Sequence, residues 1–118
     1  MENKIYQYYD LIDTVDLMLS ENYKERFVGE YLQLKIRYEK LKKFTTKIEA
    51  ANLYNEEKHC VNHADGCFKQ LKEPIHDCPY TLLMKQQKVM EEYLHILELR
   101  AEIEKIDLNK KYYFKNIL

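Results

Sequence analysis

One feature of the sequence constrains the fold more than any other: apolar and aromatic residues recur at alternating steps of four and three over three heptads. The residues in this row are Phe27, Tyr31, Leu34, Tyr38, Leu41, Thr45 and Ile48. Such a row lies along one side of an α-helix and is typical of coiled-coil-like packing. We expect a helix over residues 20–52, which at about 1.5 Å per residue would be about 48 Å long. A helix of that length needs a second long helix beside it, in the same chain or in another.

The start of this helix and one interruption can be placed from residue type. Ser20 is an expected N-cap, because its hydroxyl can accept a hydrogen bond from the first turn, and Glu21 then suits the positive end of the helix dipole. Gly29 interrupts the helix at a cost of about 1 kcal/mol relative to alanine.

A second long helix is predicted over residues 79–107. Pro79 suits its first position, and Asn109 is expected to end it. Its inner row consists of Leu83, Gln87, Met90, Leu94, Leu97 and Ala101. A second row, which we call the outer row, consists of Leu82, Val89, Ile96 and Ile103. Two adjacent rows form a face wider than one partner helix can cover, so either the N-terminal helix docks there or the chain forms oligomers.

Three shorter segments complete the chain. Residues 1–19 have the apolar spacing of an amphipathic, acidic helix. Residues 53–78 form a loop rich in Cys and His, with a short helix near 68–71, and residues 108–118 form an aromatic tail that docks on its own domain or on a neighbouring subunit. The predicted fold is therefore all-α: a single domain with a long antiparallel helical hairpin and an extra N-terminal helix, assembled as an oligomeric coiled-coil-like bundle.

Composition excludes several classes of protein. Only two glycines and two prolines occur, which disfavours a β-sandwich or a glycine-rich phosphate loop. The 19 basic and 20 acidic residues leave a net charge of −1, so general DNA binding is not expected. The sequence has no apolar run near the roughly 18 residues of a membrane span and no signal peptide at its start. Three cysteines without a secretion signal indicate a reducing cytoplasm.

The Cys/His-rich loop offers a candidate metal site. The set Cys60, His63, Cys67 and Cys78 could supply the four tetrahedral ligands that a structural zinc requires. Zinc would fold a segment that is poor in apolar residues. The alternative is that these are ordinary loop residues, since the spacing is not that of a standard zinc finger.

A basic band on the first long helix offers a candidate site for phosphates. Its cations, Lys35, Arg37, Lys40, Lys42, Lys43 and Lys47, are opposed within 13 residues by Glu39 alone. Tyrosines interleaved with such cations can stack on bases while the cations hold phosphates. The alternative is a solvated helix face whose tyrosines belong to the core. No catalytic motif is present, and Glu92 with His95 gives only one of the two Glu-x-x-His pairs of a ferritin-like centre, so we expect no enzyme.

Two stretches carry a resemblance to a known family. The first covers residues 18–27 and 30–41, and the second covers residues 78–90 and 93–103. Together they resemble a family of short helical proteins encoded by crAss-like and other gut bacteriophages. The resemblance implies a phage accessory protein but no assigned activity, so no functional residues are carried over.

These observations combine into one functional expectation. The resemblance and the basic band predict a non-enzymatic counter-defence protein of a phage, present in the host cell cytoplasm. It would sequester a small cyclic nucleotide signal at the interface of a homo-oligomer, a dimer or larger. The predicted ligand-binding residues are Tyr31, Arg37, Tyr38, Lys42, Lys43 and Arg100. The alternative is an inhibitor of a host defence protein or a phage assembly factor, which zinc would stabilise.

Overall fold

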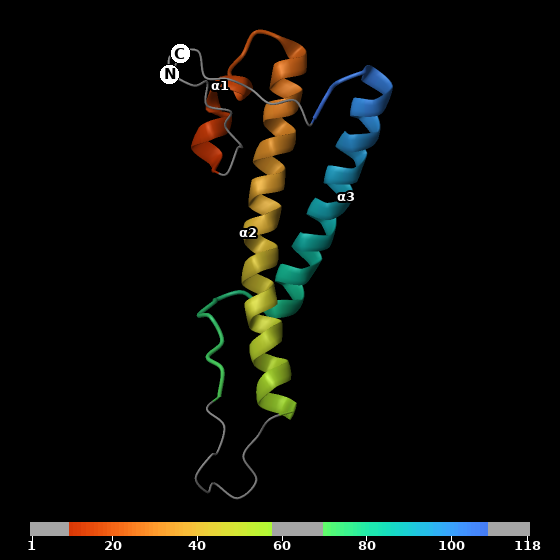
Figure 1. Ribbon diagram of the computed structural model, residues 1–118. Helices are drawn as coiled ribbons and strands as arrows, with labels where there is room; N and C mark the ends of the chain where they lie inside the picture. Colours follow the sequence, from red (N-terminus) through yellow and green to blue (C-terminus); the bar gives the residue numbers. More distant parts are fainter. Residues whose placement is uncertain (1–9, 58–69, 109–118) are drawn as a thin grey trace, which may run out of the picture. The chain divides into compact units, whose positions relative to one another are not determined.

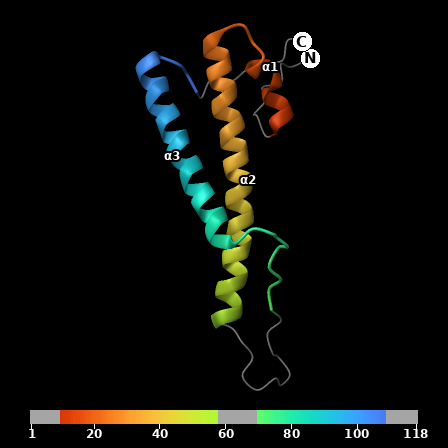
Figure 2. The same ribbon diagram turned by 180° about the vertical axis from the view of Figure 1, so that it is seen from behind.

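A computed structural model describes residues 10–57 and 70–108 (Figure 1). The elements are a 3-10 helix η1 (Leu11–Thr14), a short helix α1 (Val15–Met18) and two long helices, α2 (Tyr23–Glu57) and α3 (Tyr80–Glu104). The part of the chain that is described contains no strand. The prediction of an all-α fold with a long helical hairpin is confirmed, and Figure 2 shows the same helices from behind. None of the helices in these two ranges combines the length and the apolar character that a membrane span needs.

The chain divides into two compact units. The first unit consists of Met1–Tyr38 and Val89–Leu118, and the second consists of Glu39–Lys88. Each long helix therefore contributes one part to each unit, and the core of each unit is described separately below.

In the first unit, the predicted row on α2 and the inner row on α3 form the core. Side chains from both long helices are buried there: Phe27, Tyr31 and Leu34 on α2, and Met90, Leu94, Leu97 and Ala101 on α3. Val28, one position away from the predicted row, is 1 % exposed. The N-terminal segment described next covers a further side of α2, at the neighbouring residue Gly29.

The N-terminal segment packs against α2 where Gly29 occurs. A Cβ atom at Gly29 would lie 2.9 Å from the backbone nitrogen of Met18 and 3.0 Å from Cβ of Leu17. Those distances are too short for any side chain, so the glycine permits a close approach of the two segments. Helix α2 continues through Gly29, and this contact explains why a poor helix former occupies that position.

The prediction of one continuous helix to residue 19 is wrong for the described part of that segment. Asp10 caps η1 by accepting a 2.8 Å hydrogen bond from the Leu11 N–H, and Asp13 accepts a 3.3 Å hydrogen bond from the Asp10 N–H. This capping box starts a new helical segment at residue 11, because it satisfies backbone donors that a continuous helix would use internally. Residues 1–9 of the predicted helix lie outside the described residues.

Helix α2 begins and ends later than predicted. The side chain of Asn22, not that of Ser20, caps it by accepting hydrogen bonds from the N–H groups of Lys24 (2.8 Å) and Glu25 (3.3 Å). The Ser20 hydroxyl instead donates to the Glu25 carboxylate at 2.6 Å. The helix continues to residue 57, because residues 53–57 include no glycine or proline that would end it at 52.

Helix α3 begins one residue after the expected position. Pro79 precedes the helix, and its carbonyl accepts hydrogen bonds from the N–H groups of Leu82 and Leu83. Upstream of it, residues 70 and 71 are not helical, so the short helix predicted over 68–71 is absent there, while residues 68 and 69 lie outside the described residues.

The C-terminal end of α3 comes three residues before the expected one. Lys105 has φ 61°, a left-handed conformation, and the Ile106 N–H donates a 2.8 Å hydrogen bond to the Ala101 carbonyl. This is the bond pattern of a Schellman motif. Burial of Ile106 (8 % exposed) accompanies the turn, so apolar packing favours ending the helix at Glu104.

In the second unit, the core continues along α2 with Thr45, Ile48 and Ala51, which are all buried. The Thr45 hydroxyl donates a 2.5 Å hydrogen bond to the side-chain carbonyl of Gln87 on α3. This bond explains how a threonine and a glutamine can occupy positions in otherwise apolar rows, because buried polar groups need partners.

Candidate functional site

The six predicted ligand-binding residues do not belong to one compact unit. Tyr31, Arg37, Tyr38 and Arg100 belong to the first unit, whereas Lys42 and Lys43 belong to the second. We therefore consider each group by itself.

Tyr31 is a core residue with a hydrogen-bonded hydroxyl. Its side chain is buried, and its hydroxyl donates a 2.7 Å hydrogen bond to the carboxylate of Glu98 on α3. The Lys35 ammonium lies 5.9 Å from the centroid of its ring, a cation–π distance. The ring and the hydroxyl are thus both occupied by contacts within the chain.

Tyr38 repeats this arrangement two turns further along α2. The residue is half-buried, and its hydroxyl donates a 2.8 Å hydrogen bond to the carboxylate of Glu91. The two tyrosines are seven residues apart, and so are their two glutamates, as the antiparallel register of the helices requires. The sequence analysis missed this Tyr–Glu ladder, although the matched spacing of seven is visible in the sequence.

Arg100 is engaged by its neighbours rather than free for a phosphate. Its guanidinium donates to the Glu104 carboxylate (3.0 Å) and to the Tyr23 hydroxyl (2.5 Å), and it lies 4.9 Å from the ring centroid of Phe27. The Tyr23 hydroxyl in turn donates to Glu104 at 2.7 Å. This bond raises the pKa of Tyr23 and lowers the pKa of Glu104. The cluster keeps Glu104 ionised and neutralises the arginine.

A tyrosine on α3 makes the same kind of hydrogen bond to a glutamate on α2. The Tyr93 hydroxyl donates to the carboxylate of Glu30 on α2, and this hydrogen bond raises the pKa of Tyr93. The four tyrosine hydroxyls described in the first unit, those of Tyr23, Tyr31, Tyr38 and Tyr93, therefore connect the two long helices through carboxylates.

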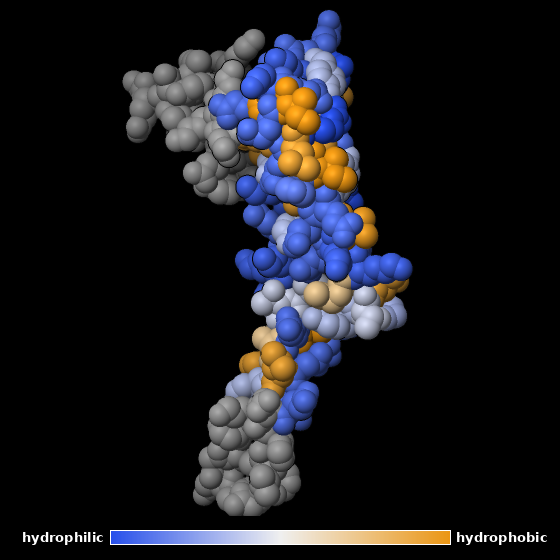
Figure 3. All heavy atoms as spheres, turned by 90° about the vertical axis from the view of Figure 1, so that its right-hand side faces the viewer, coloured by the Kyte–Doolittle hydropathy of each residue, from blue (hydrophilic) through white to orange (hydrophobic). Residues whose placement is uncertain are grey.

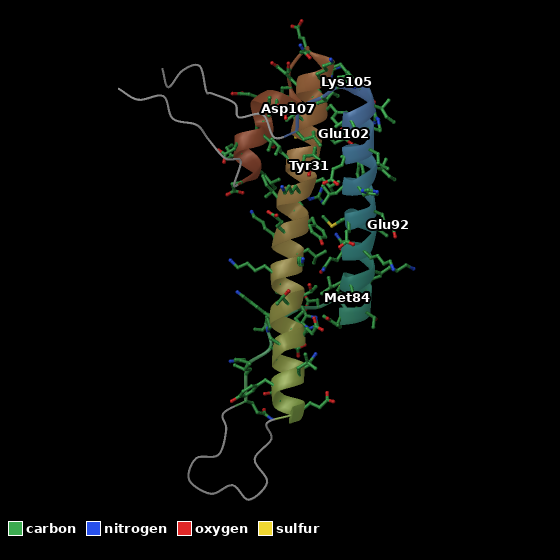
Figure 4. All side chains as sticks on the ribbon, turned by 45° about the vertical axis from the view of Figure 1, so that its right-hand side comes forward. Tyr31, Met84, Glu92, Glu102, Lys105 and Asp107 are labelled. Carbon is green, nitrogen blue, oxygen red and sulfur yellow. The ribbon has the colours of Figure 1, made fainter. Side chains whose placement is uncertain are left out.

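The pocket beside Tyr31 is acidic. It has a volume of about 260 Å³ and is lined by Tyr31, Glu98, Ala101, Glu102, Ile106, Asp107 and Leu108. Figure 4 shows Tyr31, Glu102 and Asp107 toward the end of the hairpin at which α2 begins and α3 ends. Three carboxylates repel a phosphate, so this pocket does not suit the anionic ligand for which Tyr31 was predicted.

The cations of the basic band are all exposed, but they do not share one face of α2. Within the second unit, Lys40, Lys43 and Lys47 follow the spacing i, i+3 and i+7, which places them on one side of the helix. Lys42 lies on another side. Three exposed lysines of the basic band therefore lie on one side of α2 within the second unit.

Most of the predicted zinc site lies outside the described residues. Cys60, His63 and Cys67 lie outside the described residues, and Cys78 is exposed with a free thiol. Close to it, the His76 ring bonds the Cys78 carbonyl oxygen (2.7 Å) and the Glu73 carboxylate (3.2 Å), which together raise the pKa of His76. Residues 10–57 and 70–108 contain no group of three metal-binding side chains. The zinc site stays a prediction, which the native mass of the protein with and without chelator would test.

Comparison with known proteins places the chain in a family. The Sequestin family model matches residues 21–62 and 67–103, about two thirds of the chain, and includes most of α2 and α3. The chain belongs to the Sequestin family. No curated protein and no solved structure matches it. Of the four predicted zinc ligands, His63 falls in the unmatched residues 63–66, so the complete set is not contained in the match.

Proposed function

We propose that this protein is a binding protein that sequesters a small nucleotide signal and has no enzymatic activity. Membership of the Sequestin family carries the first part of this proposal, since the family's name denotes sequestration. The nucleotide follows from charge: six cations occupy residues 35–47 of α2 against one carboxylate. Exposed lysines and arginines are the groups that attract phosphates from solution. In this proposal the protein is a bacteriophage accessory protein that acts in the host cytoplasm by lowering the concentration of a defence signal.

We also propose that the binding form is a homo-oligomer. The outer row on α3 keeps the spacing of seven that is typical of a helix–helix seam, yet its side chains remain 53–78 % exposed in the single chain. Figure 3, which looks onto the α3 side, shows hydrophobic patches among hydrophilic residues. A second copy of the chain would cover this row, and a ligand bound near the contact would be enclosed.

Native mass spectrometry of freshly purified protein tests both parts. We expect an oligomer that carries a co-purified nucleotide, whose mass identifies the ligand. Affinity for that nucleotide should fall as salt rises, because exposed charges are screened. The double substitution Lys42→Glu with Lys43→Glu should weaken binding, and unchanged affinity would remove these two lysines from the site.

A ligand-free oligomer that binds no nucleotide would contradict the sequestration proposal. It would favour the alternative, inhibition of a host protein through an apolar contact, whose strength should depend little on salt. A turnover assay on cyclic nucleotides separates binding from catalysis: intact nucleotide recovered after incubation is the expected result.

A further inference from the structure

The second unit contains a pocket that none of the predicted site residues lines. Its volume is about 440 Å³, within the roughly 300–1,000 Å³ typical of small-molecule sites. One wall is α2 and the other is the non-helical segment that precedes α3. The lining residues are Lys47, Ala50, Ala51, Leu71, Lys72, Glu73, Pro74 and Ile75.

Side chains hold the non-helical wall at both of its ends. At one end, Asn55 on α2 pairs with the backbone of Leu71: it accepts from the N–H at 2.9 Å and donates to the carbonyl at 3.0 Å. At the other end, His76 bonds the Cys78 carbonyl, and its ring stands edge-on to Phe44 at 6.2 Å. The pocket is therefore formed by a fixed wall, held in place before any ligand binds.

The charges of this pocket favour an anion. Glu73 is turned toward His76 at 3.2 Å, so its carboxylate already has a partner. Lys47 and Lys72 are both exposed, and among the described residues neither has an ion-pair partner. Both lysines line the pocket and can pair with an anion there.

The rest of the lining favours a flat apolar group. Ala50 and Ala51 have side chains small enough to leave space beside the helix. On the opposite wall, Leu71 is 46 % exposed and Ile75 is 91 % exposed. A planar ligand placed there would remove this apolar surface from water, at a gain of about 25 cal/mol for each Å² covered.

We propose that this pocket binds a small organic anion with a planar group, with Lys47 and Lys72 on the anion and the planar group against Ala50, Leu71 and Ile75. The identity of that anion rests on the proposed function, in which it is the sequestered nucleotide: its phosphate is held by the lysines and its base covers the apolar wall. The site then lies at the C-terminal end of the lysine face formed by Lys40, Lys43 and Lys47.

The test compares two variants with a control by isothermal titration calorimetry of the full chain. The probes are cyclic AMP, cyclic GMP, cyclic di-AMP and cyclic di-GMP, and the non-nucleotide anion 8-anilinonaphthalene-1-sulfonate. Lys47→Glu with Lys72→Glu should weaken binding at least about tenfold per lysine. Ala50→Trp, which keeps both lysines and fills the pocket, should abolish binding. The control, Lys85→Glu, carries the same charge change at an exposed position outside the lining and should bind as the unmodified protein does.

The outcomes separate the pocket from the proposed function. If a nucleotide binds and the double lysine variant binds it equally well, the pocket assignment is wrong and sequestration stands. If no nucleotide binds, but the naphthalene sulfonate binds and is lost in both pocket variants, the pocket stands and nucleotide sequestration is wrong. If neither kind of probe binds, both are wrong. Circular dichroism of each variant confirms that helix content is unchanged.

Discussion

The hydroxyl of Tyr31 on α2 donates a hydrogen bond to the carboxylate of Glu98 on α3, 67 residues further along the chain. This contact fixes the register of the two long helices within the first unit, and Tyr38 with Glu91 repeats it one heptad away.

Replacing Tyr31 by Phe should lower the free energy of unfolding by about 1 kcal/mol, because the ring stays packed while one hydrogen bond is lost. Urea unfolding of Tyr31→Phe, of Glu98→Gln and of the double variant measures this. The double variant should be less destabilised than the sum of the single variants. Additive effects would show that the bond does not contribute to stability.

Replacing Gly29 by Ala should destabilise the protein, although alanine is favoured over glycine inside a helix by about 1 kcal/mol. The added Cβ would lie 2.9 Å from the Met18 backbone nitrogen, so the N-terminal segment would have to move. A net loss of about 1–3 kcal/mol is expected, as for other overpacked sites. Asn52→Ala, at an exposed position of α2, is the matched control and should stabilise slightly. A stabilised Gly29→Ala variant would show that the segment does not pack there.

Stability should fall as pH rises through the raised pKa of His76. The Cys78 carbonyl and the Glu73 carboxylate favour the protonated ring, so its folded pKa lies above the ordinary value of 6.5. A group of this kind contributes stability below its unfolded pKa and loses it as pH rises through the folded pKa. Thermal unfolding measured across this range should show a decline that is reduced in His76→Gln. Equal pH dependence in both proteins would rule out a contribution from His76.

Introducing a charge into the outer row should disrupt self-association. Ile96 is 54 % exposed at the middle of this row, and Ile96→Lys would place an ammonium group in an apolar helix contact. Analytical ultracentrifugation should show an oligomer for the unmodified protein and a monomer for this variant. Glu102→Lys, an exposed change on another side of α3, should leave the oligomer intact. A monomeric unmodified protein would overturn the proposed assembly.

The core rows could be predicted because helix geometry alone fixes their spacing. Phe27, Tyr31 and Leu34 are buried as the four-three alternation requires. Helix ends were harder to predict, because several residues can cap an end. Ser20 and Asn22 are both suitable, and the structure uses Asn22. At the end of α3, Lys105 occupies a left-handed position where glycine is the usual signal.

The site was less predictable than the fold, for a physical reason. Charge density along α2 is visible in the sequence, but the partners of each residue depend on register across the hairpin. Glu98, for example, is one of several glutamates on the second long helix, and only the register of the hairpin places it opposite Tyr31. The pocket at Lys47 depends on the path of a non-helical segment, and no periodic pattern reports such a path.

The pairing of Asn55 with both backbone groups of Leu71 determines how much of the chain between them the fold depends on. The Asn55 side chain joins the two ends of the connection between residues 55 and 71. The pocket wall, which begins at Leu71, is therefore held against α2 by this pair of hydrogen bonds and not by the connection itself. Each doubling of the length of a closed loop costs only about 0.6 kcal/mol of folding free energy. The four residues that the family model leaves unmatched, 63–66, fall inside it. A longer connection should therefore cost the fold little, because Asn55 still holds Leu71 against α2.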